Sequence, residues 1–149
     1  PKSRWFKGSE SAMMSVIIVA VWKGIGYYSL IISSSIQRIP QEILEAAELD
    51  NAGRIKTFFK IILPMISPTT FMLLITMTIG AYKVFDTVNI TTGGGPGSAT
   101  MVIVYYVYEQ AFRIFRLGPA SAAGTILLII ISAVTALYFK LLSKRVHYN

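Results

Sequence analysis

The amino-acid sequence predicts an all-α, polytopic transmembrane fold. Of the 149 residues, 54% are hydrophobic and only 14% are charged, whereas a soluble domain carries about a quarter of charged residues. Three apolar runs reach the roughly 20 residues that a helix needs to cross a bilayer. Buried helices of a soluble bundle are the alternative, but the length of these runs and their lack of a charged face argue against it.

Each apolar run predicts one span. The first, 13–36, contains Lys23 near its middle. The second, 65–85, has Pro68 near its start, and the third, 120–142, is interrupted only by Lys140 at its edge. The chain is therefore expected to cross the membrane three times.

The loop between the first two spans, 37–63, is rich in charge and predicts two short helices joined by a turn. Pro40 suits the first position of a helix, where its missing N–H costs nothing. Asn51 and Gly53 supply turn chemistry, because both tolerate left-handed backbone angles. Pro64 is expected to break the helix before the next span. The second short helix has one apolar face with i, i+3, i+4 and i+7 spacing, formed by Ile55, Phe58, Phe59 and Ile62.

The segment between the second and third spans predicts a glycine-rich outer loop, 87–100, followed by a short helix. Residues 91–97 read Thr-Thr-Gly-Gly-Gly-Pro-Gly, too flexible a composition for a helix or strand. A phosphate-binding loop is the alternative, but the Lys-Ser/Thr ending of that motif is missing. The helix 101–116 is short and aromatic, which suits a position at the membrane–water boundary.

Composition also excludes several functions. The 14 Lys and Arg against 7 Asp and Glu would suggest nucleic acid in a soluble protein, but basic residues commonly flank membrane spans. We therefore expect a lipid bilayer as a partner and no nucleic acid. The chain has no cysteine, His147 stands alone, and no paired carboxylates or Ser/His/Asp set is visible. No catalytic residue, metal site or cofactor is predicted, so the chain itself is not expected to be an enzyme.

The N-terminus predicts a fragment. The chain begins at Pro1 rather than at Met, and the first residues show no cleavable signal peptide. We expect a cut or processed end.

One motif in the loop is more specific than composition. Residues 45–64 read Glu45-Ala46-Ala47, three residues, Asn51, nine residues, Ile61, one residue, then Leu63-Pro64. This pattern resembles the signature of permease subunits of binding-protein-dependent ABC importers, in which a glycine follows Glu-Ala-Ala after three residues. Asn51 replaces that glycine, and asparagine is the next most tolerant residue for a left-handed turn.

Further matches follow in the same order and are similar to the carbohydrate-transporting branch of that family. The resemblance covers nearly the whole chain, 1–149, but only the C-terminal half of a typical subunit. The matching residues are Trp22-Lys23, Gly26-Tyr27, Ile39-Pro40, Phe85-Asp86, Thr92-Gly93-Gly94-Gly95-Pro96, Ala111-Phe112 and Gly118.

The resemblance implies a partial type I importer permease core in the prokaryotic inner membrane, with 37–63 in the cytoplasm and the glycine-rich loop outside. It implies that ATP is hydrolysed on partner subunits, whose closure pushes a coupling helix and switches the access of a substrate cavity. The implied partners are a second permease subunit, an ABC ATPase dimer, an extracellular or periplasmic solute-binding protein and a small-molecule solute, expected to be a carbohydrate. The implied coupling residues are Glu45, Ala46, Ala47, Asp50, Asn51 and Gly53.

The helices on either side of the coupling loop are implied to line the substrate pathway. A lone charge such as Lys23 near the middle of a span costs ~2.5–3.5 kcal/mol on insertion scales, so it is expected to face a polar cavity. Snorkelling to an interface or pairing within the bundle is the alternative. Tyr27 offers a ring face and a hydroxyl to a sugar. The implied pathway residues are Lys23, Gly24, Tyr27, Gly80, Ala81 and Val84.

Two other functions stay open from the residues alone. A secondary transporter or channel would need ionisable relays within the spans, and it would not depend on ATP. A non-transporting membrane scaffold would show no solute-dependent coupling to an ATPase. The residues do not identify the solute, and glycerol phosphate remains among the candidates.

Overall fold

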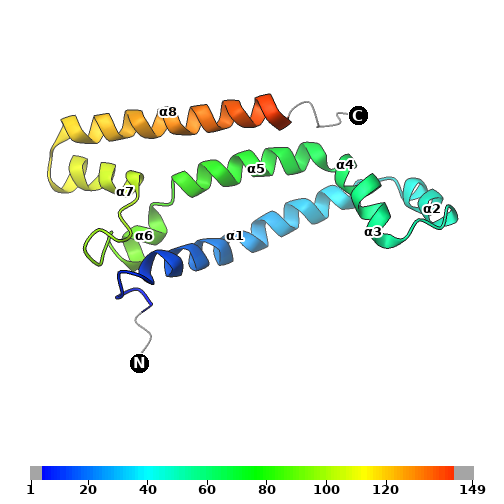
Figure 1. Ribbon diagram of the computed structural model, residues 1–149, viewed down its shortest axis with the longest axis horizontal. Helices are drawn as coiled ribbons and strands as arrows, with labels where there is room; N and C mark the ends of the chain where they lie inside the picture. Colours follow the sequence, from blue (N-terminus) through cyan, green and yellow to red (C-terminus); the bar gives the residue numbers. More distant parts are fainter. Residues whose placement is uncertain (1–4, 143–149) are drawn as a thin grey trace.

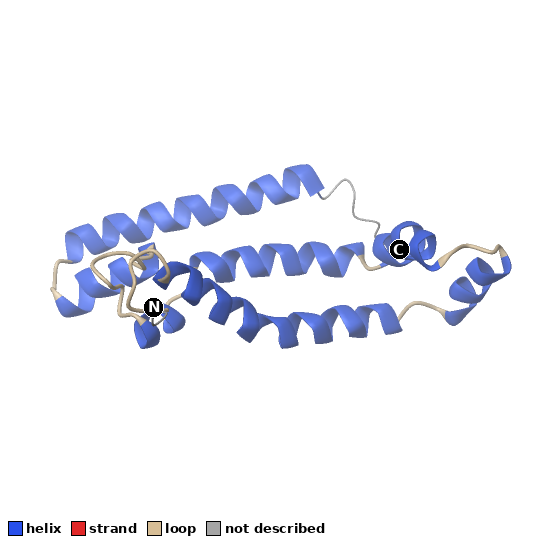
Figure 2. Ribbon diagram, turned by 60° about the horizontal axis from the view of Figure 1, so that its bottom comes forward, coloured by secondary structure: helices blue, strands red, loops and turns tan. Residues whose placement is uncertain are grey.

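The computed structural model describes residues 5–142, and all regular structure in that range is helical (Figure 2). The predicted all-α fold class is confirmed. Pro1 and His147 lie outside the described residues. Three helices are long and apolar enough to cross a membrane, over Ser9–Gln37, Ser67–Thr91 and Leu117–Leu141.

The long helices α1 (Ala12–Gln37), α5 (Ser67–Tyr82) and α8 (Leu117–Leu142) lie side by side, with α5 between the other two (Figure 1). The hydroxyl of Ser35 donates to that of Thr69 at 2.9 Å, joining α1 to α5. Thr78 donates to the Tyr138 hydroxyl at 3.1 Å, joining α5 to α8. Small hydroxyl residues commonly form hydrogen bonds between membrane helices.

Four short helices connect α1 to α5 at one end of the molecule (Figure 1). They are α2 (Gln41–Leu49), α3 (Arg54–Thr57), the π-helix η1 (Phe58–Ile62) and α4 (Leu63–Met65). Pro40 precedes α2 as its N-cap with ψ 131°, instead of occupying the first helical position as predicted.

The predicted helix break at Pro64 is wrong. Pro64 lies in α4, and the preceding turn widens into η1, where the N–H of Leu63 bonds to the carbonyl of Phe58. A proline ring clashes with the carbonyl four residues earlier and removes one hydrogen bond, and a π-turn accommodates both effects. The chain bends instead at Ile66, just before Pro68.

The second span is interrupted near its far end. Helix α5 has 16 residues, about 24 Å at 1.5 Å per residue, and stops before Lys83. After a short turn, α6 (Asp86–Thr91) continues. The loop predicted at 87–100 therefore begins later, because residues 86–91 are helical.

Helix α7 (Ile103–Tyr108) and the π-helix η2 (Glu109–Arg113) fill most of the predicted helix 101–116. They turn back through Phe115, whose φ is +59°, and run alongside the first turns of α8 (Figure 1). A helix lying flat on a membrane surface would cross the axes of the spans. The observed orientation makes this segment a hairpin with α8.

The buried core lies at the α6–α7 end of the molecule, opposite α2 and α3 (Figure 1). Val88 and Tyr105 are almost fully buried, at 0% and 1% exposed. Val16 of α1 packs with them, so the start of the first span is held to α6 and α7. Partly buried neighbours complete the cluster: Phe85, Met101, Val102 and Tyr108.

Candidate functional site

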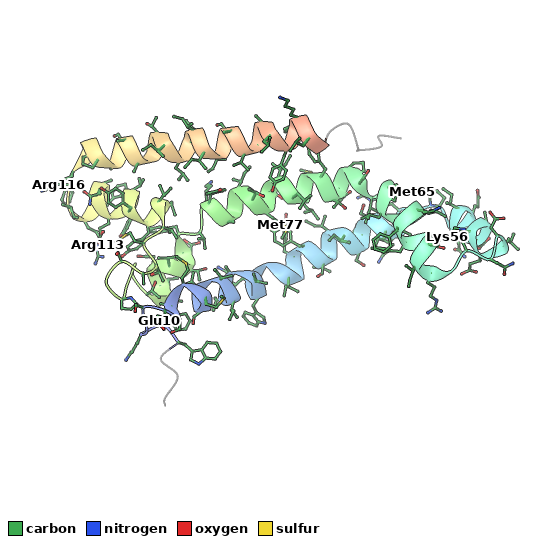
Figure 3. The ribbon with its side chains drawn as sticks, in the orientation of Figure 1. Glu10, Lys56, Met65, Met77, Arg113 and Arg116 are labelled. Carbon is green, nitrogen blue, oxygen red and sulfur yellow. The ribbon has the colours of Figure 1, made fainter. Side chains whose placement is uncertain are left out.

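The candidate coupling loop is a self-contained helix–turn–helix at the end of two spans. Helix α2 lies farthest from the spans, and α3 lies between α2 and the start of α5 (Figure 1). Side chains cover both short helices, and Lys56 of α3 lies at this end of the molecule (Figure 3). Helix α1 ends and α5 begins here, so the loop connects two spans directly along the chain.

The turn after α2 is a Schellman motif. The N–H of Ala52 bonds to the carbonyl of Ala47 at 3.0 Å, and that of Asn51 bonds to Glu48 at 3.0 Å. Asn51 adopts the left-handed conformation that this motif requires, with φ +50°. The expected turn thus forms with asparagine in the position where the motif has glycine.

Gly53 does not share that task. Its φ is −59° and its ψ 150°, an ordinary extended conformation at the N-cap of α3. Its carbonyl accepts the N–H of Thr57 at 3.0 Å. Asn51 alone therefore carries the left-handed turn.

Substitutions at Asn51 test this turn. Asn51→Val is expected to lower the free energy of unfolding by about 1–2 kcal/mol, because a β-branched residue is strained at a positive φ. Asn51→Gly is the matched control and should keep or slightly raise stability. Thermal unfolding of the purified chain in detergent measures both. Equal midpoints for valine and glycine would contradict the left-handed turn.

The remaining coupling candidates divide into exposed and buried positions. Glu45 and Ala46 are exposed on α2, and the Gln41 amide donates to the Glu45 carboxylate at 2.8 Å. Asp50 is exposed at the C-cap. Ala47 is only 5% exposed, and its carbonyl accepts the Ala52 N–H of the turn. Ala47 thus supports the shape of the turn, while Glu45 and Ala46 are available to a partner.

The pathway candidates lie on two helices and are largely exposed. Lys23 and Tyr27 of α1 are exposed, and the ring of Tyr27 meets that of Tyr28 edge-on at 5.3 Å. A Cβ on Gly24 would come within 3.0 Å of the Tyr28 ring, so this glycine makes room for it. Gly80 and Ala81 are exposed at the end of α5, and Val84, half-buried, follows in the turn. Across residues 5–142, no hydrogen bond or ring contact joins the α1 set to the α5 set.

The glycine-rich loop is more ordered than its composition indicates. Thr100 is fully buried, donates to the Gly95 carbonyl at 2.9 Å, and lies 2.7 Å from the Thr92 hydroxyl. Gly94, with φ +83°, packs against Tyr105 so closely that a Cβ would lie 2.8 Å from the ring.

The sequence did not lead us to expect that Tyr105 and Arg113 hold the glycine-rich loop in place. Arg113 donates to the Tyr105 hydroxyl at 3.2 Å, which fixes the ring beneath the glycine-rich loop. Tyrosine residues closely following three glycines were the available signal, because aromatic rings pack well against glycine backbone.

No cluster of three or more His, Cys, Asp or Glu that could hold a metal ion occurs in the described part of the chain.

One family model and several known transport proteins match this chain. Residues 4–148 match the family described as "Binding-protein-dependent transport system inner membrane component". The chain is 43% identical over 143 residues to the sn-glycerol-3-phosphate transport system permease protein UgpA of Agrobacterium fabrum, covering 94% of this chain and 48% of that protein. It is 40% identical over 136 residues to the Probable ABC transporter permease protein YurN of Bacillus subtilis, covering 91% and 47%.

A solved structure has the same fold. It is a bacterial ABC transporter involved in the import of the acidic polysaccharide alginate, with a TM-score of 0.77 and 24% identity. The match covers 92% of this chain and 50% of that chain. The chain thus spans about half the length of the proteins that it matches.

Proposed function

Because the chain belongs to the family of inner membrane components of binding-protein-dependent transport systems, we propose that it supplies part of the translocation pathway of an ATP-driven importer. The observation that carries the proposal is the Schellman-capped helix–turn–helix at the shared end of α1 and α5. With Asn51 in place of the glycine, it carries the residues of the motif through which such permeases contact an ATPase.

The coupling step uses α2. Glu45 and Ala46 are exposed on the helix farthest from the spans. Ala46 lets the backbone approach a socket closely, and Glu45 offers a carboxylate to a cationic partner, since charge-assisted hydrogen bonds are the strong ones. Ala47, Asp50, Asn51 and Gly53 hold the shape of the loop. The ATPase subunits close on ATP, push α2, and switch the cavity between two rigid-body states.

A contact between the end of α1 and the start of α5 supports transmission of motion from α2 to the spans. The Ser35–Thr69 hydrogen bond joins the last turns of α1 to the first turns of α5 at 2.9 Å. Motion of α2 therefore reaches both helices together.

The solute lies against Lys23, Gly24 and Tyr27 on α1 and against Gly80, Ala81 and Val84 at the end of α5.

Membership of the family supports three protein partners. A second permease subunit completes the pathway, an ABC ATPase dimer docks on the cytoplasmic side at 37–63, and a solute-binding protein delivers solute on the other side. The complex lies in the prokaryotic inner membrane. The solute is a sugar or sugar-like compound, and the names of the relatives put sn-glycerol-3-phosphate first among those to test.

Uptake into proteoliposomes tests the function. The assembled transporter that contains this chain is expected to take up radiolabelled sn-glycerol-3-phosphate, or a sugar, only when ATP is supplied to the ATPase side. Tyr27→Ala should reduce uptake roughly tenfold, the equivalent of one lost hydrogen bond of about 1.4 kcal/mol, with ATPase copurification unchanged. Uptake driven by an ion gradient without ATP would indicate a secondary transporter. Normal uptake by Tyr27→Ala would remove Tyr27 from the pathway.

A further inference from the structure

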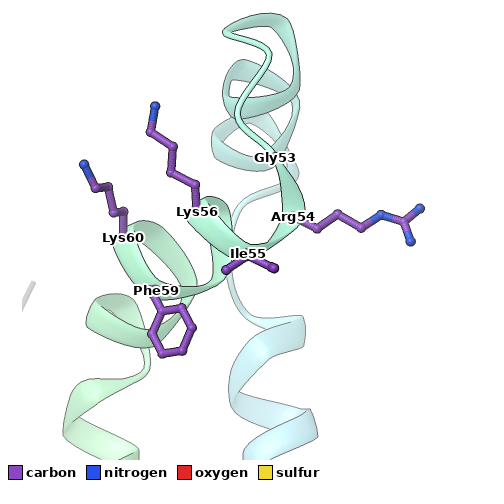
Figure 4. A pocket seen from close by; sticks show the side chains of 6 residues that line it. All are labelled: Gly53, Arg54, Ile55, Lys56, Phe59 and Lys60. Atoms are coloured by element: carbon purple, nitrogen blue, oxygen red, sulfur yellow. The ribbon is translucent and has the colours of Figure 1, made fainter.

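Helix α3 and the π-helix η1 carry a compact basic and apolar surface that the coupling role does not use. A shallow, open groove with an apolar floor lies here, bordered by Gly53, Arg54, Ile55, Lys56, Phe59 and Lys60 (Figure 4). We call these residues the basic groove. Its three cations lie within seven residues of sequence, on a segment that has no acidic residue.

The groove separates charge from apolar surface. Lys56 and Lys60 extend in the same direction, whereas the ring of Phe59 points away from them (Figure 4). Ile55 is 78% exposed and Phe59 62% exposed, so the apolar side is not covered by the rest of the chain. Arg54 extends to a third side (Figure 4). A short helix whose lysines and exposed apolar side chains lie on different sides suits a membrane surface.

The three cations have no partner within residues 5–142. Neither a hydrogen bond nor an ion pair of Arg54, Lys56 or Lys60 occurs there, although the carboxylates of α2 are close in sequence. Within 37–63 the acidic residues lie on α2 and its cap, and the basic residues lie on α3 and η1, except for Arg38, which precedes α2. The loop therefore presents two surfaces of opposite charge, and a single partner of one charge does not satisfy both.

The basic groove lies just beyond the end of α5 that faces the loop. Helical hydrogen bonds from Ile66 to Ile62 at 3.0 Å and from Thr70 to Ile66 at 2.9 Å connect η1 to α5. Lys60 thus precedes the start of α5 by about 10 Å of helix, and a headgroup layer extends roughly 5–7 Å beyond the hydrocarbon. Lys56 and Lys60 extend away from the spans (Figure 4), and their flexible stems allow the charged ends to turn back toward that layer. Helix α2 lies beyond this layer, farther from the spans (Figure 1).

We propose that the basic groove binds the phosphate headgroups of anionic phospholipids in the leaflet where α1 and α5 end. Arg54, Lys56 and Lys60 contact the phosphates, while Ile55 and Phe59 enter the acyl-chain boundary. The site holds the second half of the loop at the membrane surface. This inference requires only that α1 and α5 span a membrane, so it stands or fails separately from the solute and the ATPase.

The test places a fluorescent reporter in the groove. Phe59→Trp is made in a chain whose Trp5 and Trp22 are replaced by phenylalanine, and the full chain is reconstituted into phosphatidylcholine vesicles. Brominated phosphatidylglycerol or brominated phosphatidylcholine is added at equal mole fraction, and quenching of the tryptophan is compared. One cation near an anionic lipid corresponds to about a fivefold preference. We expect quenching to favour phosphatidylglycerol by at least about fivefold.

Charge variants in the same reporter chain locate the site. Lys56→Gln/Lys60→Gln should bring the two lipids to nearly equal quenching, and Lys56→Arg/Lys60→Arg should retain the preference. The matched control Lys83→Gln/Arg116→Gln removes two cations at the opposite end of the molecule, where Arg116 lies (Figure 3), and should change nothing.

Two results overturn the proposal. The first is that quenching in the reporter chain does not favour phosphatidylglycerol, or that it still favours phosphatidylglycerol in Lys56→Gln/Lys60→Gln. The other is the absence of quenching by either lipid, combined with loss of ATPase copurification in Lys56→Gln/Lys60→Gln, which would assign the groove to a protein partner.

Discussion

Ala47→Trp is expected to abolish copurification of the ATPase with the assembled transporter almost completely. Ala47 is 5% exposed, and its carbonyl accepts the Ala52 N–H that closes the turn. An indole has no room there, and overpacking of this kind costs typically ~1–3 kcal/mol or more. Helix α2 has only nine residues, too few to hold its shape without the turn.

Ala46→Trp and Glu45→Ala separate contact from shape. Both side chains are exposed, so the turn persists in both variants. A tryptophan at Ala46 prevents close approach to a socket. Loss of the Glu45 carboxylate removes a charged hydrogen bond worth ~1.5–3 kcal/mol, which weakens docking about tenfold or more.

Lys56→Ala is the control for these variants, because Lys56 belongs to the basic groove and not to α2. It should leave ATPase copurification close to that of the unchanged chain. If the ATPase also copurifies normally with the Ala46→Trp and Glu45→Ala variants, α2 is not the docking surface. That conclusion holds even if Ala47→Trp loses the ATPase.

Gly94→Ala is expected to destabilise the opposite end of the molecule by about 2–5 kcal/mol. Its φ of +83° disfavours any side chain, at a cost of roughly 1–2 kcal/mol. The new Cβ would also meet the Tyr105 ring at 2.8 Å, and the buried, hydrogen-bonded ring has little freedom to move, which adds about 1–3 kcal/mol. The measurement is the thermal unfolding midpoint of the purified chain.

Gly97→Ala is a matched control within the same loop. Gly97 also has a positive φ, +63°, but a Cβ there would meet nothing within 4 Å. It should show only the conformational part of the cost, about 1–2 kcal/mol. Equal destabilisation by the two substitutions would mean that the contact with Tyr105 contributes nothing.

The features predicted well from the sequence are those set by local chemistry. Three apolar runs of sufficient length predict three membrane-crossing helices, because hydrocarbon leaves the backbone few other options. The left-handed turn at Asn51 was likewise predictable, since few residues tolerate that conformation and the motif requires it. Both depend on properties of short segments and not on distant contacts.

The features that were missed depend on contacts between distant segments, or on residues that are compatible with two local structures. Ala47 is buried whereas Ala46 beside it is exposed, and two identical neighbouring residues give the sequence no means of telling them apart. Pro64 can either break a helix or widen the turn before it, and continuity with α5 favours the second outcome. The order of the glycine-rich loop comes from Tyr105 and Arg113, which follow it in sequence and fold back beneath it.

Cross-linking tests the central claim, that α2 contacts an ATPase, most directly. The chain has no cysteine, so a single cysteine can be placed at Ala46 or, as a control at the opposite end, at Ser98. Each is labelled with a short photoreactive cross-linker in the assembled transporter in native membranes. The account predicts a cross-link to the ATPase subunit from Ala46→Cys and none from Ser98→Cys. No ATPase adduct from Ala46→Cys, or an equal adduct from Ser98→Cys, would contradict it.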